Sequence, residues 1–218
     1  MCPHALLSQA WSHIFNYGNH TFQFNLFTDV ECTTKDEDND TPLMLAIQYY
    51  DSFSQQHTKA FSTLKRGESS TQMLTCLLER ADVNAPNASG TTPLSLAVQQ
   101  QDENIVELLL DTPDIEVNKS NLQGYIPLHF ASAGKKTELI TMLLDKGADL
   151  FSKTAKGYIP IYIACQRGFS ESLEHSIKKC QSEKQQQMLE AKDYNGNIPL
   201  LLAAEVQSHA APSDYLQM

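Results

Sequence analysis

The stretch Gly124-Tyr125-Ile126-Pro127-Leu128-His129-Phe130-Ala131 decides the fold, because its pattern recurs along the chain. Each copy has a proline, then a leucine or isoleucine, and an alanine four residues after the proline. The copies are 40–46, 91–97, 125–131, 158–164 and 197–203, and their prolines are 51, 34, 33 and 39 residues apart. This recurrence predicts stacked, similar units, because no single unit of that length hides its apolar face alone.

Each copy also has the features of a helix start. Proline suits the first helical turn, because its missing N–H would have no partner inside the helix. Thr41 and Thr92 precede two of the prolines, where a hydroxyl can accept from an unpaired N–H. Apolar residues follow at helical spacing, and a second helix is predicted where 105–109 repeats that spacing. Gly147 is predicted to end one such second helix in the left-handed conformation.

The segment from Gly124 to Asp149 resembles an ankyrin repeat almost position by position. Residues 127–129 match the start of its first helix, and 143–149 match the end of its second. The endings 77–84 and 108–110 are similar, and the resemblance covers about residues 36–206. It implies an all-α fold, an ankyrin-repeat solenoid of about five helix-turn-helix repeats with short β-hairpin loops.

The repeats predict a division of the chain. We expect repeats at about 36–85, 86–119, 120–152, 153–191 and 192–206, the last being partial. Residues 1–35 do not match the repeat and are interpreted as an N-terminal helical cap, with a partner-binding helix as the alternative. Residues 207–218 are expected to form a tail that resembles the start of a further repeat.

The chain departs from the family pattern at several positions. Ile126, Ile159 and Ile198 replace the usual threonine before the proline, so each forgoes a capping hydroxyl worth about 1 kcal/mol. His129 therefore lacks its usual hydroxyl partner, and we expect a structural role for it. An insertion at 51–68 is interpreted either as a functional loop or as a plain surface loop, and a polar one at 181–187 as a helix extension.

Composition excludes several classes of function. The formal net charge is −10, from 16 Lys and Arg against 26 Asp and Glu, so we expect no nucleic-acid partner. No long apolar run or secretory signal is visible, which predicts no membrane insertion and a cytoplasmic location. Five cysteines without a CxxC pair suggest reduced thiols, with Cys76 and Cys165 filling the core.

A search for catalytic motifs finds none. The sequence contains no GxxxxGK[ST] loop, GxSxG elbow or HExxH pair, and its seven histidines are scattered. A zinc site at Cys2-Pro3-His4 is not expected, because two potential ligands near a chain end are too few. We therefore expect no enzyme activity, no catalytic residue, no cofactor and no metal.

The ankyrin resemblance implies binding through hairpin tips and the exposed face of the first helices. Tyr125 and Tyr158 share one repeat position and Leu122 and Tyr194 another, so both pairs are expected in rows along a groove. The alternative is that the tyrosines only cover backbone. The predicted partner-binding residues are Glu37, Asp38, Asp40, Gln48, Tyr49, Ser89, Thr91, Gln99, Gln100, Leu122, Gln123, Tyr125, Lys156, Tyr158, Gln166, Arg167, Tyr194, Asn197 and Glu205.

The first functional hypothesis is a protein–protein interaction scaffold or adaptor with another protein as partner. The second is the substrate-recognition N-terminal region of a longer enzyme, suggested by repeats that break off near Met218. The divergent repeats also resemble those of effectors that intracellular bacteria deliver into host cells, which would imply the host cytoplasm. The chain is expected to be a monomer or part of a longer chain; repeats that only hold a homo-oligomer together are a third option.

Overall fold

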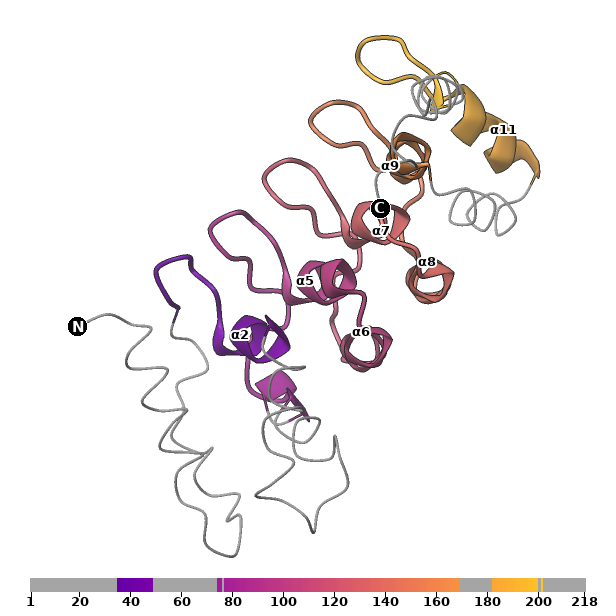
Figure 1. Ribbon diagram of the computed structural model, residues 1–218. Helices are drawn as coiled ribbons and strands as arrows, with labels where there is room; N and C mark the ends of the chain where they lie inside the picture. Colours follow the sequence, from indigo (N-terminus) through magenta and orange to yellow (C-terminus); the bar gives the residue numbers. More distant parts are fainter. Residues whose placement is uncertain (1–34, 49–73, 76, 169–181, 200, 202–218) are drawn as a thin grey trace, which may run out of the picture. The chain divides into compact units, whose positions relative to one another are not determined.

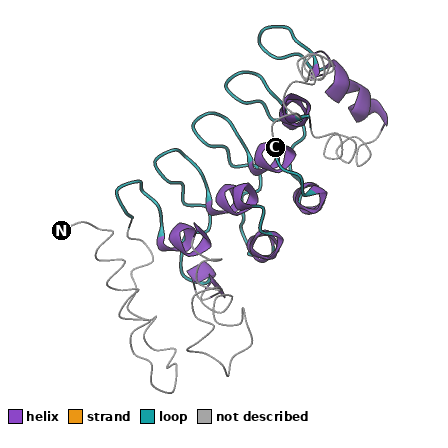
Figure 2. Cartoon of the chain, in the orientation of Figure 1, coloured by secondary structure: helices purple, strands orange, loops and turns teal. Residues whose placement is uncertain are grey.

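The computed structural model describes residues 35–48, 74–75, 77–168, 182–199 and 201. These contain helices α2 (Pro42–Gln48), α5 (Pro93–Gln100), α6 (Glu103–Leu110), α7 (Pro127–Ser132), α8 (Thr137–Asp145), α9 (Pro160–Arg167) and α11 (Ser182–Glu190). Figure 2 shows only helices and loops among these residues, so the described part of the chain is all-α. The predictions for the N-terminal cap, the 51–68 insertion, Cys76 and the C-terminal tail lie outside the described residues.

The chain divides into two compact units, Met1–Leu96 and Ala97–Met218, and α5 contains the boundary. We call them unit 1 and unit 2. Unit 1 holds α2, and unit 2 holds α6 to α11. In both units a long loop leads into the proline that begins a first helix, as Figure 1 shows for α2, α7 and α9.

The first helices begin in two different ways. In α2 and α5, the hydroxyl oxygens of Thr41 and Thr92 accept the N–H groups of Met44 and Ser95 at 3.3 and 3.2 Å, which confirms the predicted caps. The isoleucines before α7 and α9 cap nothing, as expected, but both side chains are buried. Burial of these side chains offsets part of the lost hydrogen bond, because apolar area removed from water is stabilising.

The second helices pack by the predicted apolar spacing. Ile105, Val106 and Leu109 are buried in α6, and Leu139, Ile140 and Leu143 are buried in α8. The carboxylate of Asp102 accepts the N–H of Ile105 at 3.1 Å and so begins α6. Gly147 follows α8 with a φ of 83°, which confirms the predicted left-handed end.

The core of unit 2 continues across its helices. Ile159, Ile161, Tyr162, Cys165 and Met188 form one buried cluster that joins α9 to α11. Cys165 is only 4% exposed, so the prediction that it fills the core is confirmed. The helix predicted for the 181–187 insertion is present as part of α11, and its Met188 side chain is fully buried.

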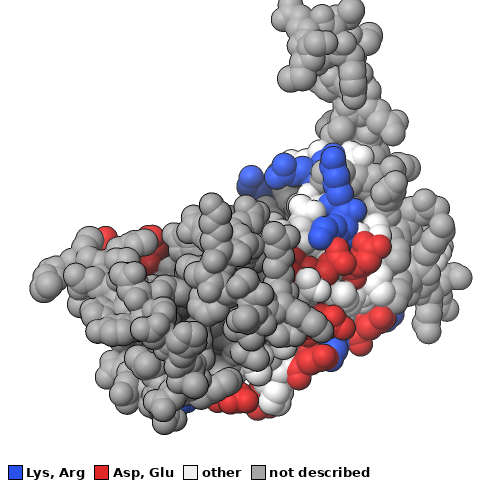
Figure 3. All heavy atoms as spheres, turned by 60° about the horizontal axis from the view of Figure 1, so that its bottom comes forward, with Lys and Arg blue, Asp and Glu red and all other residues white. Residues whose placement is uncertain are grey.

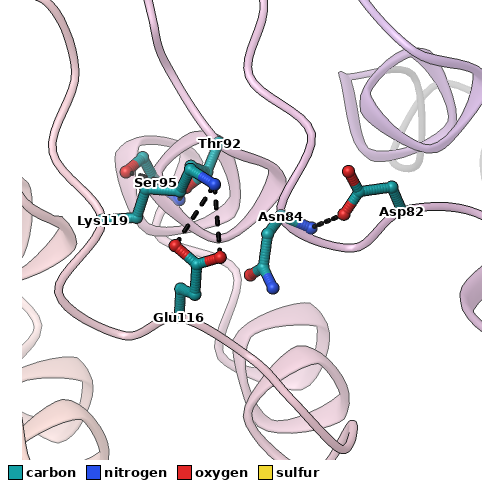
Figure 4. A network of polar contacts seen from close by, with 6 residues as sticks. All are labelled: Asp82, Asn84, Thr92, Ser95, Glu116 and Lys119. Carbon is teal, nitrogen blue, oxygen red and sulfur yellow. Dashed lines mark hydrogen bonds and ion pairs between the residues drawn. The ribbon is translucent and has the colours of Figure 1, made fainter.

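Several local polar contacts fix the loops between helices. The carboxylate of Asp82 accepts the N–H of Asn84 at 2.9 Å, and Lys119 forms an ion pair with Glu116 at 3.2 Å (Figure 4). Both are short-range contacts at exposed or half-exposed positions. They therefore shape their own loops and contribute little to stability.

Two ion pairs join the second helices of unit 2. Lys136 lies 2.9 Å from Glu103, and Lys146 lies 3.0 Å from Asp111, so both pairs join the ends of α8 to those of α6. Figure 3 shows a side of the molecule on which basic and acidic side chains lie next to each other.

Candidate functional site

Five loops share one local geometry, although their sequences differ. We call them hairpin loops and number their residues one to five: 36–40, 87–91, 121–125, 154–158 and 193–197. The N–H of the first residue donates to the carbonyl oxygen of the fifth at 2.9–3.2 Å in all five. The fourth residue has positive φ in each, and four of the five fourth residues are glycine.

The side chain of the first residue organises each hairpin loop. In every loop its side-chain oxygen accepts the N–H groups of the third and fifth residues at 2.7–3.4 Å. These first residues are Asp36, Asn87, Asn121, Thr154 and Asp193. Asp, Asn and Thr form such local bonds readily, because their oxygen lies a short distance from the backbone. The hairpin tips consequently share one hydrogen-bonded backbone frame.

The two described hairpin loops of unit 1 are bonded to each other. The N–H of Ala88 donates to the carbonyl of Asp38 at 2.8 Å, and the amide of Asn87 donates to the carboxylate of Asp40 at 2.9 Å. The ammonium group of Lys35 reaches the carbonyl of Pro86 at 3.0 Å.

The three hairpin loops of unit 2 are joined by the same kinds of bond. The N–H of Ala155 donates to the carbonyl of Gln123 at 2.9 Å, and that of Tyr194 donates to the carbonyl of Lys156 at 3.4 Å. Lys153 repeats the role of Lys35, because its ammonium group reaches the carbonyl of Lys192 at 3.2 Å. Successive tips in unit 2 are therefore fixed next to one another.

His129 connects a first helix to the following hairpin loop. Its Nδ1 accepts the N–H of Ile126 at 3.1 Å, so its Nε2 carries the proton and donates to the carbonyl of Tyr158 at 3.0 Å. Burial lowers the pKa of His129 below 6.5, against opposing hydrogen bonds to backbone groups. The predicted structural role is confirmed, and the backbone of Ile126 serves in place of the missing threonine hydroxyl.

Tyr162 makes the equivalent connection one repeat later, and the sequence analysis missed it. Its hydroxyl accepts the N–H of Asp193 at 3.0 Å and shares its proton between the carbonyls of Ala191 and Asn197. Burial raises the pKa of Tyr162 above 10.0. The signal was present in the repeat alignment, because Tyr162 stands two residues after Pro160, as His129 does after Pro127.

The predicted binding residues at the hairpin loops divide into two groups by orientation. Those at the second and third positions are exposed: Glu37, Asp38, Ser89, Leu122, Gln123, Lys156 and Tyr194. Those at the fifth position are buried or half-buried: Asp40, Thr91, Tyr125, Tyr158 and Asn197. The two groups occupy different positions of the repeat, the second and third against the fifth, although one binding role was predicted for both.

The inward group contacts its own repeat or the neighbouring loop. Asp40 accepts the amide N–H groups of Gln48 at 3.0 Å and Asn87 at 2.9 Å, so its carboxylate is occupied. The Tyr125 ring lies 5.6 Å from that of Phe130, and the Tyr158 ring lies 5.4 Å from that of Tyr162, both stacked. At least part of each tyrosine surface is thus used inside the protein.

The first-helix residues of the predicted set lie at helix ends. Gln99, Gln100, Gln166 and Arg167 are exposed, whereas Gln48 is half-buried against Asp40. Tyr49 and Glu205 lie outside the described residues.

The outward residues of unit 2 form a surface that we call the unit 2 hairpin face: Leu122, Gln123, Ala155, Lys156 and Tyr194. Leu122 is 79% exposed and Tyr194 is 68% exposed. The ammonium group of Lys153 lies 5.7 Å from the centre of the Tyr194 ring, within reach of a cation–π contact.

The described residues offer little for chemistry. No group of three or more His, Cys, Asp and Glu side chains is placed to hold a metal ion in this part of the chain. Burial raises the pKa of Cys165 to about 11, so its thiol is not ionised near neutral pH and is a poor nucleophile. Nor does any helix among the described ranges have the length and apolar character needed to span a bilayer.

Paired helices behind rigid, mutually bonded hairpin tips define a helical repeat protein with an exposed tip surface. A family model for ankyrin repeats in three copies matches residues 10–121 and 60–154. The chain belongs to the ankyrin repeat family. Proteins of this family are generally protein-interaction modules, and the repeat itself is a non-catalytic fold. The resemblance to bacterial effectors stays a prediction.

Several curated proteins are similar to this chain over part of its length. It is 32% identical to the tyrosine-protein kinase Shark of Drosophila melanogaster over 107 residues, and these cover 49% of this chain and 11% of the kinase. It is 33% identical over 100 residues to human Rabankyrin-5, covering 45% of this chain and 9% of that protein. It is 29% identical over 107 residues to the palmitoyltransferase AKR1 of Lachancea kluyveri, covering 49% and 14%. The chain therefore spans only a small part of these relatives, and the enzymes among them match in the repeat region.

Proposed function

We propose that this chain binds another protein through the unit 2 hairpin face. One observation carries the proposal: Leu122 and Tyr194 expose 79% and 68% of their surface on loops that hydrogen bonds hold rigid. Burying such side chains in a complex is favourable, and rigid loops lose little conformational freedom on binding. The exposed ends of the first helices, with Gln166 and Arg167, extend the proposed contact surface within unit 2.

Among the predicted binding residues, Leu122 and Tyr194 are better candidates for a partner contact than Tyr125 and Tyr158. Tyr125 and Tyr158 are half-buried and stacked on their own helices, so their removal would also disturb the fold. Leu122 and Tyr194 have most of their surface free, and they are the better residues for testing a partner contact.

The test is quantitative affinity capture with the Leu122→Ser/Tyr194→Ser double variant as bait beside the wild type. We expect partners of the wild type to be recovered at least about tenfold less, as for interface side chains of large effect. Leu189→Ser is the matched control, because Leu189 is 37% exposed on α11, which is not part of the hairpin face. Recovery of the same partners in equal amounts by all three baits would show that the face is not the binding surface.

A second candidate is that these repeats select substrates for an enzyme of which they are one part. The similarity to a tyrosine-protein kinase and a palmitoyltransferase supports it, because both carry the matched region within much longer chains. Sequencing the parent gene beyond the codon for Met218 tests it. An open frame that encodes a catalytic domain is the expected result, and a stop codon at that point would remove this candidate.

A further inference from the structure

We infer that the unit 2 hairpin face takes an acidic, extended peptide segment that carries an apolar side chain. The inference rests on the proposed function and adds the chemistry of the partner. Three properties of the face support it: an apolar row, an excess of unpaired positive charge, and its spread over three loops.

The apolar row runs along equivalent positions of successive loops. Leu122, Ala155 and Tyr194 are the second residues of the three hairpin loops of unit 2, and backbone hydrogen bonds join each loop to the next. The loops also approach closely, since a Cβ atom at Gly124 would lie 2.9 Å from the Cα of Thr154. An apolar side chain of a partner can therefore rest on Ala155 between the larger Leu122 and Tyr194.

Positive charge flanks this row. Lys153, Lys156 and Lys192 are exposed and lie at or directly before the loops at 154–158 and 193–197. Lys153 is held by the Lys192 carbonyl, while Lys156 and Lys192 form no ion pair with any residue that the structure describes. This differs from the second helices, where Lys136 and Lys146 each have an acidic partner.

The acidic residue among these loops does not cancel that charge for a ligand. Asp193 is buried, and its carboxylate accepts the backbone N–H groups of Asn195 and Asn197 and the side-chain amide of Asn197 at 2.8–3.1 Å. Backbone and side-chain hydrogen bonds from Asn197 lower the pKa of Asp193 against the effect of its burial. Its oxygens are directed into the loop, so a partner meets lysine ammonium groups at the surface.

A peptide fits these features better than a nucleic acid does. Binding to DNA or RNA relies on neutralising many phosphates, and this face and its flanks offer only Lys153, Lys156 and Lys192 on a chain of net charge −10. Apolar contacts on three successive loops, with lysines at the second and third of them, suit a segment whose side chains point to one side at regular intervals. An extended strand with carboxylates around one large apolar residue has this arrangement.

The experiment selects ligands from a phage-displayed library of random short peptides on the immobilised full chain. Fluorescein-labelled copies of the enriched sequences are then titrated by anisotropy against the wild type and against the Leu122→Ser/Tyr194→Ser variant. We expect net negative sequences with at least one large apolar residue. We also expect Lys156→Glu/Lys192→Glu to raise their Kd by about tenfold or more, with weaker binding at higher salt.

The matched control is Lys135→Glu/Lys184→Glu, which changes the net charge equally at two exposed lysines away from the hairpin loops. We expect it to change Kd by less than about twofold, because neither lysine belongs to the hairpin loops and salt screens exposed charges. Similar losses in both double variants would show that overall charge, and not this face, attracts the peptide, and would overturn the inference.

Other outcomes separate this inference from the proposed function. Neutral or basic peptides that still lose binding in Leu122→Ser/Tyr194→Ser would overturn the acidic partner and leave the hairpin face as a protein-binding surface. Peptides that bind that variant as well as the wild type would overturn both. A library that shows no enrichment on the immobilised chain over empty beads would also overturn the acidic-peptide inference. So would binding of an oligo-dT strand to this face in the absence of peptide.

Discussion

The two junctions between successive hairpin loops of unit 2 share a backbone arrangement and differ in the side chain that completes it. In the first junction, loops 121–125 and 154–158 are joined by Ala155 and Gln123, and His129 donates to the carbonyl of Tyr158. In the second, loops 154–158 and 193–197 are joined by Tyr194 and Lys156, and Tyr162 donates to the loop carbonyls.

The difference shows what this repeat position requires. Both side chains are buried donors that reach the following loop, so a donor of sufficient length satisfies the position whether it is an imidazole or a phenol. The imidazole also accepts a bond from its own helix start, and burial lowers its pKa below 6.5. The phenol bonds to backbone groups of Ala191, Asp193 and Asn197, and burial raises its pKa above 10.0.

The largest effect is expected from the close approach in the second junction. Gly157 has a φ of 82°, and a Cβ atom there would lie 2.7 Å from the backbone nitrogen of Tyr194. Gly157→Ala should therefore lower the free energy of unfolding by about 2–5 kcal/mol, from left-handed strain plus overpacking.

Gly196→Ala is the matched control, because Gly196 has a φ of 85° but nothing within 4 Å of the added atom. It should cost about 1–2 kcal/mol, for backbone strain alone. Urea unfolding of the two variants measures the difference. Equal losses would mean that the contact between Gly157 and Tyr194 is not tight.

Removing the Tyr162 hydroxyl is expected to break the hydrogen bonds of the second junction while retaining its packing. Tyr162→Phe leaves the buried N–H of Asp193 without this acceptor and removes the donor to two carbonyls, for a loss of about 1–3 kcal/mol. The measurement is the urea midpoint at constant slope. In Tyr158→Phe, the same atom is removed from a half-buried ring, and a loss as large as that of Tyr162→Phe would contradict the assignment.

The first junction is expected to be sensitive to pH, unlike the second. Burial lowers the pKa of His129 in the folded state, so between that value and 6.5 the unfolded chain binds more protons. The contribution of neutral His129 to the free energy of unfolding is therefore fully present above pH 6.5. It falls as the pH drops toward the pKa of His129 in the folded state, by up to about 1.4 kcal/mol per pH unit. Below the folded pKa this loss levels off.

Urea unfolding at a series of pH values, for the wild type and for His129→Gln, isolates this contribution. The amide keeps a donor but does not titrate, so the difference in stability between the two proteins should shrink as the solution becomes acidic. A difference that stays constant from pH 7 to well below 6.5 would show that His129 is not held neutral by the fold.

The helices could be predicted from the sequence, because a proline at the first turn and apolar residues at helical spacing are local signals. Thr41 and Thr92 cap as expected, and Gly147 ends its helix as expected. The same local signals do not predict which hairpin side chains point toward the helices. That orientation depends on the first residue of each loop bonding to the fifth, which turns Tyr125 and Tyr158 toward their helices.

Tyr162 was missed for a related reason. Its partners Ala191 and Asn197 are 29 and 35 residues away, across an insertion that makes the fourth interval between prolines longer. The ankyrin resemblance marks a histidine at this position, as at His129. A tyrosine there has the appearance of an ordinary core residue until the backbone carbonyls of the next repeat are in place.

The smallest expected effect concerns the ends of α7 and α9, where Ser132 and Cys165 each stand five residues after the proline of its repeat. The hydroxyl of Ser132 is buried and has no hydrogen-bond partner among the described residues, whereas Cys165 lies in an apolar cluster. Ser132→Ala should raise the free energy of unfolding by about 0.5–1 kcal/mol, because it removes an unpaired polar group. The reverse exchange, Cys165→Ser, should lower it by about 1 kcal/mol, because it places such a group in an equivalent site. Thermal melts of the two variants would contradict this account if their midpoints moved in the same direction, since the argument requires that the polarity of the atom, and not its size, decides the sign.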